Sequence, residues 1–439
     1  MSVFPTRHGT EIKTTDYTNE GWVGQGSYAV VYNASAVSPS PKRSPSRSPS
    51  RSRSPTVGDK RTAEVAAIDA IDAKCNVGDR RVVVKVNDGG PCECAPCECS
   101  ESRGAPCGLF TDPVNAQRVA IEVALLRNIN SPYIVRCLGA LPYSDKDGAV
   151  GCVLEAYDTS LQRMLDSDTG NMFDTIFHVQ YVMYQVILGL HELHRRGVAH
   201  YDVSASNILL TRRCRAALCD LGLASYAARA SECRTIVWNR APEVVVASRR
   251  GGVYDYKADI FAAGCVLASM LQLQRRAAAH RAGAPVAAGS RRPLFSDGAE
   301  GMRTSELLLI QFEVTGVPSE DDLAALDNLK PAERQALAQL VTDAPIDVRA
   351  DLRAGQLDEL LDGAPAGAIA LVRAMLQTNP AKRPDCATIL AHEFFAIHAQ
   401  WELPPLAEPA ESLTGALDAV YAAGLSNTRL RQLFKMLTS

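Results

Sequence analysis

The chain has 439 residues, of which 46% are hydrophobic, and its formal net charge is only -3. This balance is typical of a folded globular protein, and it excludes a chain that is disordered throughout or that binds nucleic acid through its overall charge. The longest apolar run, IFAAGCVLASM, is far shorter than the roughly 20 residues of a membrane-spanning helix, so we expect no transmembrane segment.

Residues 1–18 form an N-terminal extension without the apolar block of a secretory signal, which predicts that the protein stays inside the cell. Cysteines in that compartment are reduced. Most of the thirteen cysteines stand singly in apolar stretches, and we expect these to be small buried hydrophobic residues, as for Cys137, Cys152, Cys219 and Cys265.

The first patterned segment is GWVGQGSYAVVY, in which Gly24 and Gly26 lie between two apolar runs. Two glycines allow a strand-turn-strand backbone to approach phosphate oxygens without a Cβ clash. The signal is weak by itself, because such hairpins are common and Ala29 stands where a third glycine would be expected.

The insert at residues 36–80 begins within SAVSPSPKRSPSRSPSRSRSP, a repeat with almost no apolar residues that starts at Ser35. Such a segment cannot offset the entropy cost of ordering, so we expect it to be disordered. Its Ser-Pro sites followed by a basic residue are candidate phosphorylation sites. The repeat also resembles the Arg/Ser tails of splicing proteins, which implies a nuclear address or RNA contact, although a solvated spacer is favoured over RNA binding.

Residues 88–110 form a second insert, rich in Gly, Pro and Cys, which we interpret as a loop. The cysteines of its CECAPCEC motif are candidate thiolate ligands of Zn²⁺ or Cu⁺. Their spacing differs from the paired Cys-x-x-Cys knuckles of a structural zinc site, and no histidine lies nearby. A surface loop is therefore favoured over a metal site at Cys92, Cys94, Cys97 and Cys99.

Between the inserts, RVVVKV predicts a buried strand that carries Lys85. A lone cation that faces a core is costly unless it is paired. Apolar spacing predicts a helix from Val114 that ends near Ser131, before a proline. Glu122 is the only acid of its RVAIEVALLRNI segment. Lys85 either pairs with Glu122 or turns to solvent at the end of its strand, and this residue taken by itself favours the second alternative.

A second helix is predicted from about Asp174 to Arg195, and the motif HYDVSASN follows it. Asp202 and Asn207 lie in this motif, and Asp220 follows in CDLGLA after two strand-like runs that form a hairpin. Phosphoryl transfer requires a carboxylate that orients a hydroxyl, with an amide oxygen and a second carboxylate that hold Mg²⁺. The alternative is three turn-forming side chains of a common kind.

The C-terminal half has several helical patterns and few strands, so we expect an α+β protein in two lobes. A low-complexity insert at residues 272–291 interrupts this half. Residues 401–439 form a tail, in which a Pro-rich linker precedes a segment with amphipathic helical spacing.

The order of these motifs is more specific than any one of them. Gly-x-Gly, a strand Lys, a helix Glu, His-x-Asp-x(4)-Asn, Asp-x-Gly and Ala-Pro-Glu match the signature set of protein kinases in order and approximate spacing. Apart from the inserts, the chain resembles the eukaryotic protein kinases from Asn19 to Ala399. The segments WNRAPE, YKADIFAAGCVLASM and VRAMLQTNPAKRPDCATILAHEFF are similar to the proline-directed group that includes cyclin-dependent and mitogen-activated kinases.

This resemblance implies the two-lobed protein-kinase fold, with a small lobe at residues 19–156, a helical lobe at residues 157–400 and ATP bound between them. The implied activity is transfer of the γ-phosphate of Mg-ATP to Ser or Thr of protein substrates, mainly before Pro, since Arg240 precedes Ala-Pro-Glu. A cyclin-like activating subunit remains open, because the helix near Glu122 shows no recognisable cyclin-binding sequence.

The same resemblance implies a role for each residue of the motifs. Lys85 would hold the α- and β-phosphates, and Glu122 would orient Lys85. Asp202 would orient the substrate hydroxyl, while Asn207 and Asp220 would hold Mg²⁺. Further positions implied to bind ATP are Gly24, Gly26, Val31, Glu155 and Tyr157, with Leu154 at the back of the adenine pocket and Glu243 and Arg383 as a structural ion pair in the large lobe.

Three positions depart from the family pattern. Tyr201 stands where many kinases have the Arg that reads a phosphorylated activation loop, so this charge sensor is absent. Ser204 stands where Ser/Thr kinases usually carry a Lys that reaches the γ-phosphate, and Ile236, next to Thr235, stands where a bridging Thr is normal. Losing one positioned donor costs roughly 3–4 kcal/mol, which slows an enzyme without abolishing its activity.

The buried charges of the site are all retained, and these are the groups that are costly to keep without a use. The sequence therefore favours an active kinase. One alternative is a pseudokinase that binds nucleotide and acts as a scaffold, and another makes the Arg/Ser insert the functional part.

Overall fold

The computed structural model describes residues 2–5, 11–14, 17–25, 29–36, 81–87, 113–141, 143, 149–166, 173, 175–226, 237–247, 255–283, 294–295, 304–326, 355–406 and 413–438. All structural statements below concern these residues. The Ser/Pro/Arg repeat, the CECAPCEC motif, Gly26, Thr235 and Ile236 lie outside the described residues, so the predictions made for them remain predictions.

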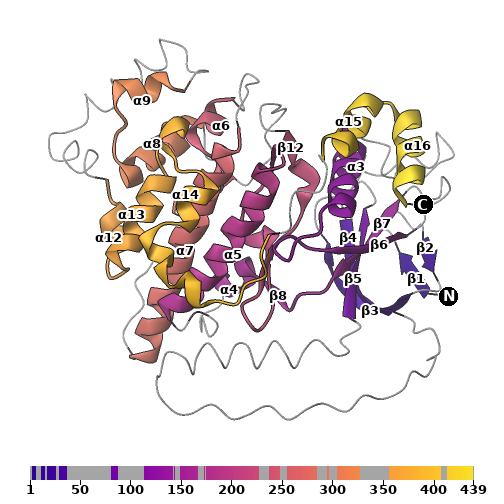
Figure 1. The fold of residues 1–439 in the computed structure, drawn as a ribbon, viewed down its shortest axis with the longest axis horizontal. Helices are drawn as coiled ribbons and strands as arrows, with labels where there is room; N and C mark the ends of the chain where they lie inside the picture. Colours follow the sequence, from indigo (N-terminus) through magenta and orange to yellow (C-terminus); the bar gives the residue numbers. More distant parts are fainter. Residues whose placement is uncertain are drawn as a thin grey trace.

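The described N-terminal part is built on a five-stranded antiparallel sheet in the order β3-β4-β5-β7-β6, beside helix α3 (Figure 1). A small hairpin, β1 with β2, precedes it in the chain. The bounds are β1 Ser2–Pro5, β2 Glu11–Thr14, β3 Tyr17–Gln25, β4 Ala29–Ala36, β5 Arg81–Asn87, α3 Pro113–Asn128, β6 Cys137–Leu141 and β7 Val150–Glu155.

Strand β5 shows how the sequence specifies this sheet. Val82, Val84 and Val86 alternate on one face, are 6%, 0% and 0% exposed, and pack in a cluster with residues of β4 and β7. Side chains alternate between the two faces of a strand, so Lys85 lies on the opposite face. From there its side chain reaches α3.

The C-terminal part is mainly helical, with α5 packed against α7 at its centre (Figure 1). The helices are α4 Leu161–Asp166, α5 Ile176–His194, α6 Pro242–Ala247, α7 Lys257–Arg281, α8 Thr304–Thr315, α9 Glu320–Ala324, α12 Leu357–Leu360, α13 Ala366–Met375 and α14 Cys386–Leu390. Short strands lie at its boundary with the sheet: β8 Thr159–Ser160, β9 Val198–Ala199, β10 Ile208–Leu210, β11 Ala216–Leu218 and β12 Ser225–Tyr226.

The low-complexity insert expected at residues 272–291 is wrong for its first ten residues. Helix α7 continues through them without a break to Arg281. The segment QLQRRAAAHR consists largely of strong helix formers, although its narrow range of residue types resembles that of a low-complexity segment. Arg276 is 9% exposed, and its Nη2 donates to the backbone oxygen of Leu165 at 2.8 Å. Residues 284–291 lie outside the described residues.

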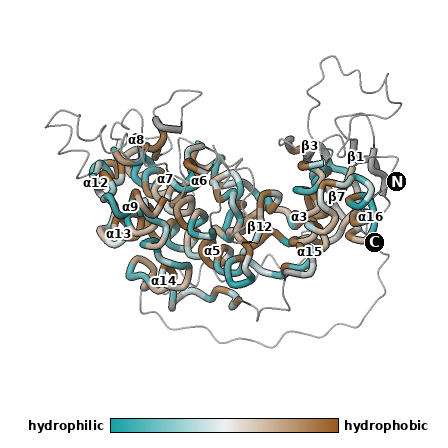
Figure 2. The backbone as a smooth tube through the Cα atoms, turned by 90° about the horizontal axis from the view of Figure 1, so that it is seen from above, coloured by the Kyte–Doolittle hydropathy of each residue, from teal (hydrophilic) through white to brown (hydrophobic). Residues whose placement is uncertain are grey.

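The tail forms two helices, α15 Thr414–Ala423 and α16 Asn427–Thr438, and both pack against α3 (Figures 1 and 2). Gly424 ends α15 with φ 57° and ψ -143°, a positive-φ conformation that glycine adopts without a Cβ clash. The tail returns the chain from the large lobe to the small one. Its buried apolar residues are Leu413, Leu417, Val420, Leu430, Leu433 and Phe434.

Candidate active site

Lys85 and Glu122 form an ion pair between β5 and α3. Lys85 Nζ lies 2.6 Å from Glu122 Oε1 and 3.4 Å from Asp220 Oδ1, and the Glu122 side chain is only 4% exposed. Burial alone lowers the pKa of Lys85, but the charges of Asp220 and Glu122 outweigh it and raise the pKa above its ordinary value. Lys85 therefore does not turn to solvent. It stays a cation between two carboxylates.

Lys85 belongs to a row of residues that crosses the sheet. Gly24 pairs with Val31, Val31 with Lys85, and Lys85 with Cys152. Three residues implied to bind ATP thus lie side by side on neighbouring strands. The glycine hairpin is anchored in register with the cation that would hold the phosphates.

The motif HYDVSASN follows β9, and a buried carboxylate of α7 fixes its backbone. Asp259 accepts hydrogen bonds from the backbone N–H groups of His200 and Tyr201, both at 2.8 Å. Its Oδ2 also lies 2.9 Å from Nε2 of His194. Tyr201 has φ 59°, a left-handed conformation that costs a non-glycine residue about 1–3 kcal/mol. The bonds to Asp259 hold this turn in place.

Asp202 and Asn207 are joined across the same loop. Asn207 Nδ2 donates to the backbone oxygen of Asp202 at 2.9 Å and to its Oδ2 at 2.8 Å. This leaves the amide oxygen of Asn207 as the atom available to a cation. Burial raises the pKa of Asp202, which makes its carboxylate a better proton acceptor.

The β10-β11 hairpin brings Asn207 and Asp220 together. Asn207 precedes β10, Asp220 follows β11, and the backbone N–H of Cys219 donates to the backbone oxygen of Asn207 at 2.9 Å. Lys85 lowers the pKa of Asp220, so this carboxylate is ionised. One carboxylate and one amide oxygen fit Mg²⁺ that is also bound by phosphates and water. The described residues hold no cluster of three or more His, Cys, Asp or Glu that would bind a metal unaided.

The segment expected to be the hinge leaves β7 at Glu155. Its carboxylate accepts a hydrogen bond from Nη2 of Arg215 at 2.5 Å, and the Arg215 guanidinium lies 5.2 Å from the centre of the Tyr157 ring. The side chain of Glu155 therefore binds Arg215, and a ligand would bind to the backbone of this segment. Sequence reasoning missed Arg215, because no motif marks a partner 60 residues away.

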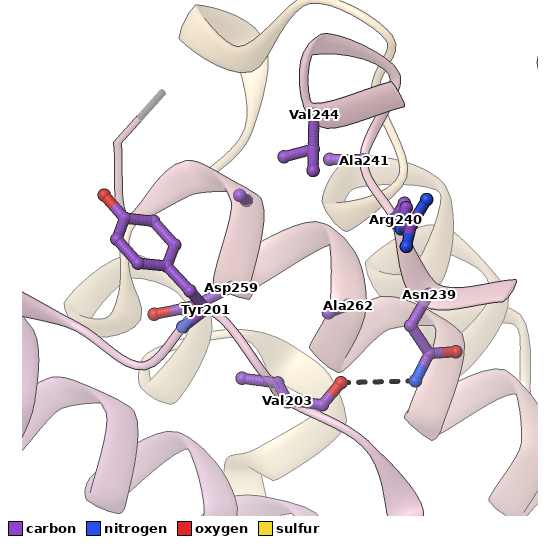
Figure 3. Close-up of a pocket in the computed structure, with 9 residues that line it drawn as sticks. Tyr201, Val203, Asn239, Arg240, Ala241, Val244, Asp259 and Ala262 are labelled. Carbon is purple, nitrogen blue, oxygen red and sulfur yellow. Dashed lines mark hydrogen bonds between the residues drawn. The ribbon is translucent and has the colours of Figure 1, made fainter. Parts of the chain in front are cut away.

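Two of the departing residues are described. Ser204 is 2% exposed, and its Oγ has no hydrogen-bond partner in the part of the chain that the structure describes. Its hydroxyl therefore makes no protein contact that takes the place of the lysine expected at this position. Tyr201, 7% exposed, lines a cavity (Figure 3) together with Val203, and these two residues flank Asp202 in the chain. The cavity lies between this loop and helices α6 and α7, and its other lining residues include Asn239, Arg240, Ala241 and Val244.

The ion pair expected between Glu243 and Arg383 is formed with both guanidinium nitrogens. The two nitrogen-oxygen distances are 2.6 and 2.7 Å. Arg383, 2% exposed, also donates to the backbone oxygens of Gln377, Thr378 and Lys257. This pair fastens the Ala-Pro-Glu segment to the stretch of chain that leads into α14.

None of the helices in the described ranges is both long enough and apolar enough to cross a membrane.

Comparison with known proteins agrees with this geometry. Residues 110–395, more than half of the chain, match the family model described as protein kinase domain. Mitogen-activated protein kinase KSS1 of Saccharomyces cerevisiae is 30% identical over 320 residues, which cover 68% of this chain and 77% of that protein. Mitogen-activated protein kinase 10 of Arabidopsis thaliana is 29% identical, with 69% and 68% covered. Mitogen-activated protein kinase spk1 of Schizosaccharomyces pombe is 28% identical, with 68% and 72% covered.

Proposed function

Because this chain belongs to the protein kinase family and is a serine/threonine kinase by its relatives, we propose that it is catalytically active with Mg-ATP and prefers Ser or Thr before Pro. The observation that carries the proposal is the charge arrangement around Lys85. A cation 2.6 Å from Glu122 and 3.4 Å from Asp220 is what a phosphate clamp next to a metal ligand requires.

Each residue of the site has a role in this proposal. Lys85 holds the α- and β-phosphates, and Glu122 keeps its ammonium group in place. Asn207 and Asp220 would hold Mg²⁺, which when bound would neutralise charge on the phosphates. Asp202 accepts the proton of the substrate hydroxyl. The oxygen of that hydroxyl bonds to the γ-phosphorus, and the bond between the γ-phosphorus and the bridging oxygen of ADP breaks. The glycine hairpin and the backbone of residues 155–157 bind the rest of ATP.

The cavity lined by Val203 supports the preference for proline. Val203, Ala241 and Val244 give it an apolar lining, which suits a pyrrolidine ring (Figure 3). Because Val203 follows Asp202 in the chain, the position of the cavity suits the residue that follows the phosphorylated Ser or Thr. The backbone oxygen of Arg240 accepts a hydrogen bond from Gln311 Nε2 at 2.7 Å, so one wall of the cavity is fixed.

A cyclin-like subunit is not part of this proposal. The helix that carries Glu122, α3, is covered by α15 and α16 of the same chain. The partners proposed are therefore protein substrates.

The test is transfer of the γ-phosphate to matched Ser-Pro and Ser-Ala peptides by the full-length protein. We expect transfer, a lower KM for the Ser-Pro peptide, and loss of at least 100-fold in Asp202→Asn with ATP binding retained. Equal counts from the wild type and Asp202→Asn, with ATP bound by both, contradict the proposal.

That last outcome favours the scaffold alternative. The observation behind this alternative is the buried, unpartnered hydroxyl of Ser204, where a lysine would supply a charge to the γ-phosphate.

A further inference from the structure

Two cysteines lie on adjacent strands behind the Lys85-Glu122 pair. Cys137 begins β6, and Cys152 lies in β7. The register pairs Cys137 with Leu154 and Ala140 with Cys152, with a bulge after Cys137. Residues two apart in β7 point to the same face, so Cys137 is the diagonal neighbour of Cys152 on that face. Both side chains pack into the large core cluster that contains the buried face of α3.

The surroundings of the two thiols differ. Contrary to the expectation that both are buried, Cys137 is partly exposed, while Cys152 is 1% exposed. A hydrogen bond with Cys152 lowers the pKa of Cys137 to about 7, although burial opposes this effect. The same bond and complete burial raise the pKa of Cys152. Cys137 is thus the accessible nucleophile, and Cys152 is a protonated thiol held next to it.

We propose that Cys137 and Cys152 form a redox switch, in which a hydroperoxide oxidises Cys137 and Cys152 then closes a disulfide between β6 and β7. In the first step the Cys137 sulfur attacks one peroxide oxygen. The O–O bond breaks, Cys137 becomes a sulfenic acid, and water or an alcohol leaves after taking up a proton. In the second step the Cys152 sulfur attacks the Cys137 sulfur, the S–O bond breaks, and water leaves with the thiol proton. The two thiols lose two electrons, which the peroxide accepts.

The position of Cys152 connects this chemistry to the active site. Cys152 pairs with Lys85 in the β5-β7 register, and both thiols lie within the electrostatic field of Glu122. A disulfide is about 2.05 Å long, shorter than any contact between two thiols, so oxidation draws the Cys152 sulfur toward β6. The packing behind the Lys85-Glu122 pair then changes. We expect a higher KM for ATP in the oxidised protein, and this part rests on the proposed function.

The chemical test needs no kinase activity. The reduced full-length protein is titrated with hydrogen peroxide, trapped with an alkylating reagent and digested without reductant, and the linked peptides are identified by mass spectrometry. We expect the Cys137–Cys152 linkage to form before any other, to disappear with dithiothreitol, and to be absent in Cys137→Ser and Cys152→Ser. Cys265→Ser, which alters a buried thiol of α7, keeps the linkage and serves as the matched control.

Accumulation of sulfenic or sulfinic acid at Cys137 without the linkage overturns the proposal. Linkage of either thiol to a cysteine of residues 88–110 instead overturns it as well.

A second measurement tests whether the Cys137–Cys152 disulfide changes the binding of ATP. Phosphate transfer is followed in the same samples, where we expect the KM for ATP to rise several-fold with linkage and to return with dithiothreitol. In Cys152→Ser the KM for ATP should be the same before and after peroxide. A complete linkage with an unchanged KM shows that the disulfide is not a switch. If the reduced protein transfers no phosphate, the proposed function fails while the linkage result still stands, and ATP affinity measured by calorimetry replaces the kinetic readout.

Discussion

The hydroxyl oxygens of Ser225 in β12 and Tyr421 in α15 lie 2.6 Å apart, although the two residues are separated by 196 positions in the chain. The neighbouring Tyr226 donates its OH to Asp418 Oδ1 at 3.0 Å. Because β12 follows Asp220 closely, the tail contacts the segment that leads away from this proposed metal ligand. The same tail helix packs on α3, which carries Glu122. One helix thus touches the elements on both sides of Lys85.

Substitution Tyr421→Phe removes the hydroxyl that contacts Ser225 and keeps the aromatic ring. We expect faster amide hydrogen exchange in residues 221–226 and a loss of about 1 kcal/mol in the free energy of unfolding, the usual worth of one hydrogen bond. Tyr143→Phe is the matched control, because its OH accepts from Arg431 of α16 and lies away from β12. Equal exchange of residues 221–226 in the two variants would show that Tyr421 does not hold β12.

Breaking the Glu243-Arg383 pair should be strongly destabilising. The Arg383 side chain is 0% exposed in this pair, so Glu243→Gln leaves a buried charge without its partner, at a cost of about 3–5 kcal/mol. Denaturant unfolding of the wild type and of Glu243→Gln measures this loss in the free energy of unfolding. The control is Lys382→Met, which breaks the pair with Asp322, where the lysine side chain is 53% exposed, and which should cost at most about 1 kcal/mol. Similar losses in both variants would contradict the expectation.

Arg215 should support the binding of ATP without taking part in the transfer. Its contacts are with Glu155 and Tyr157 of the hinge, so Arg215→Ala should raise the KM for ATP several-fold and leave kcat nearly unchanged. Arg212→Ala is the control, since Arg212 is 89% exposed and lies 3.9 Å from Asp158. A fall in kcat with an unchanged KM would place Arg215 in a different role.

Ser204→Ala tests whether the hydroxyl at the missing lysine position is used. The buried Oγ has no partner, and removing an unsatisfied polar atom should raise the free energy of unfolding by about 1 kcal/mol. We expect kcat to be unchanged. A tenfold lower kcat would mean instead that the Ser204 hydroxyl contacts the phosphates when ATP is bound.

The rate of Cys137 alkylation should depend on pH. The pKa of Cys137 is lowered to about 7, so the reactive thiolate increases as pH rises through that value, and the rate should reach half its maximum near pH 7. Cys152→Ala removes the hydrogen bond that is the main cause, and the midpoint should move up toward the ordinary thiol pKa of about 8.5. Labelling followed by peptide mass spectrometry measures both. A midpoint that does not move would assign the lowered pKa to another group.

The elements with strong periodicity were predictable from the sequence. The strand with alternating valines, α3 and α5 lie where the apolar spacing predicts, because each buries one continuous face. The cost of burying a charge left the pairing of Lys85 with Glu122 as one of two alternatives, and the order of the motifs favoured it. These inferences depend on local patterns or on general electrostatics, both of which a single sequence contains.

Other features depend on contacts that no local pattern records. The partner of Glu155 proved to be Arg215, and the partner of Ser225 proved to be Tyr421. The tail was expected as one amphipathic segment, and the Gly424 turn divides it into two helices with separate contacts on α3. The sequence shows that these faces are apolar, but only the fold shows what they cover.

The position of α15 and α16 has a consequence for the synthesis of the protein. These helices follow the whole large lobe in the chain, yet they cover α3 of the small lobe. During translation α3 emerges from the ribosome some 300 residues before the helices that cover it. The residues of α3 that pack against the tail are thus made well before the residues that cover them. The contacts of α3 with α15 and α16 are therefore among the last to form as the chain is made.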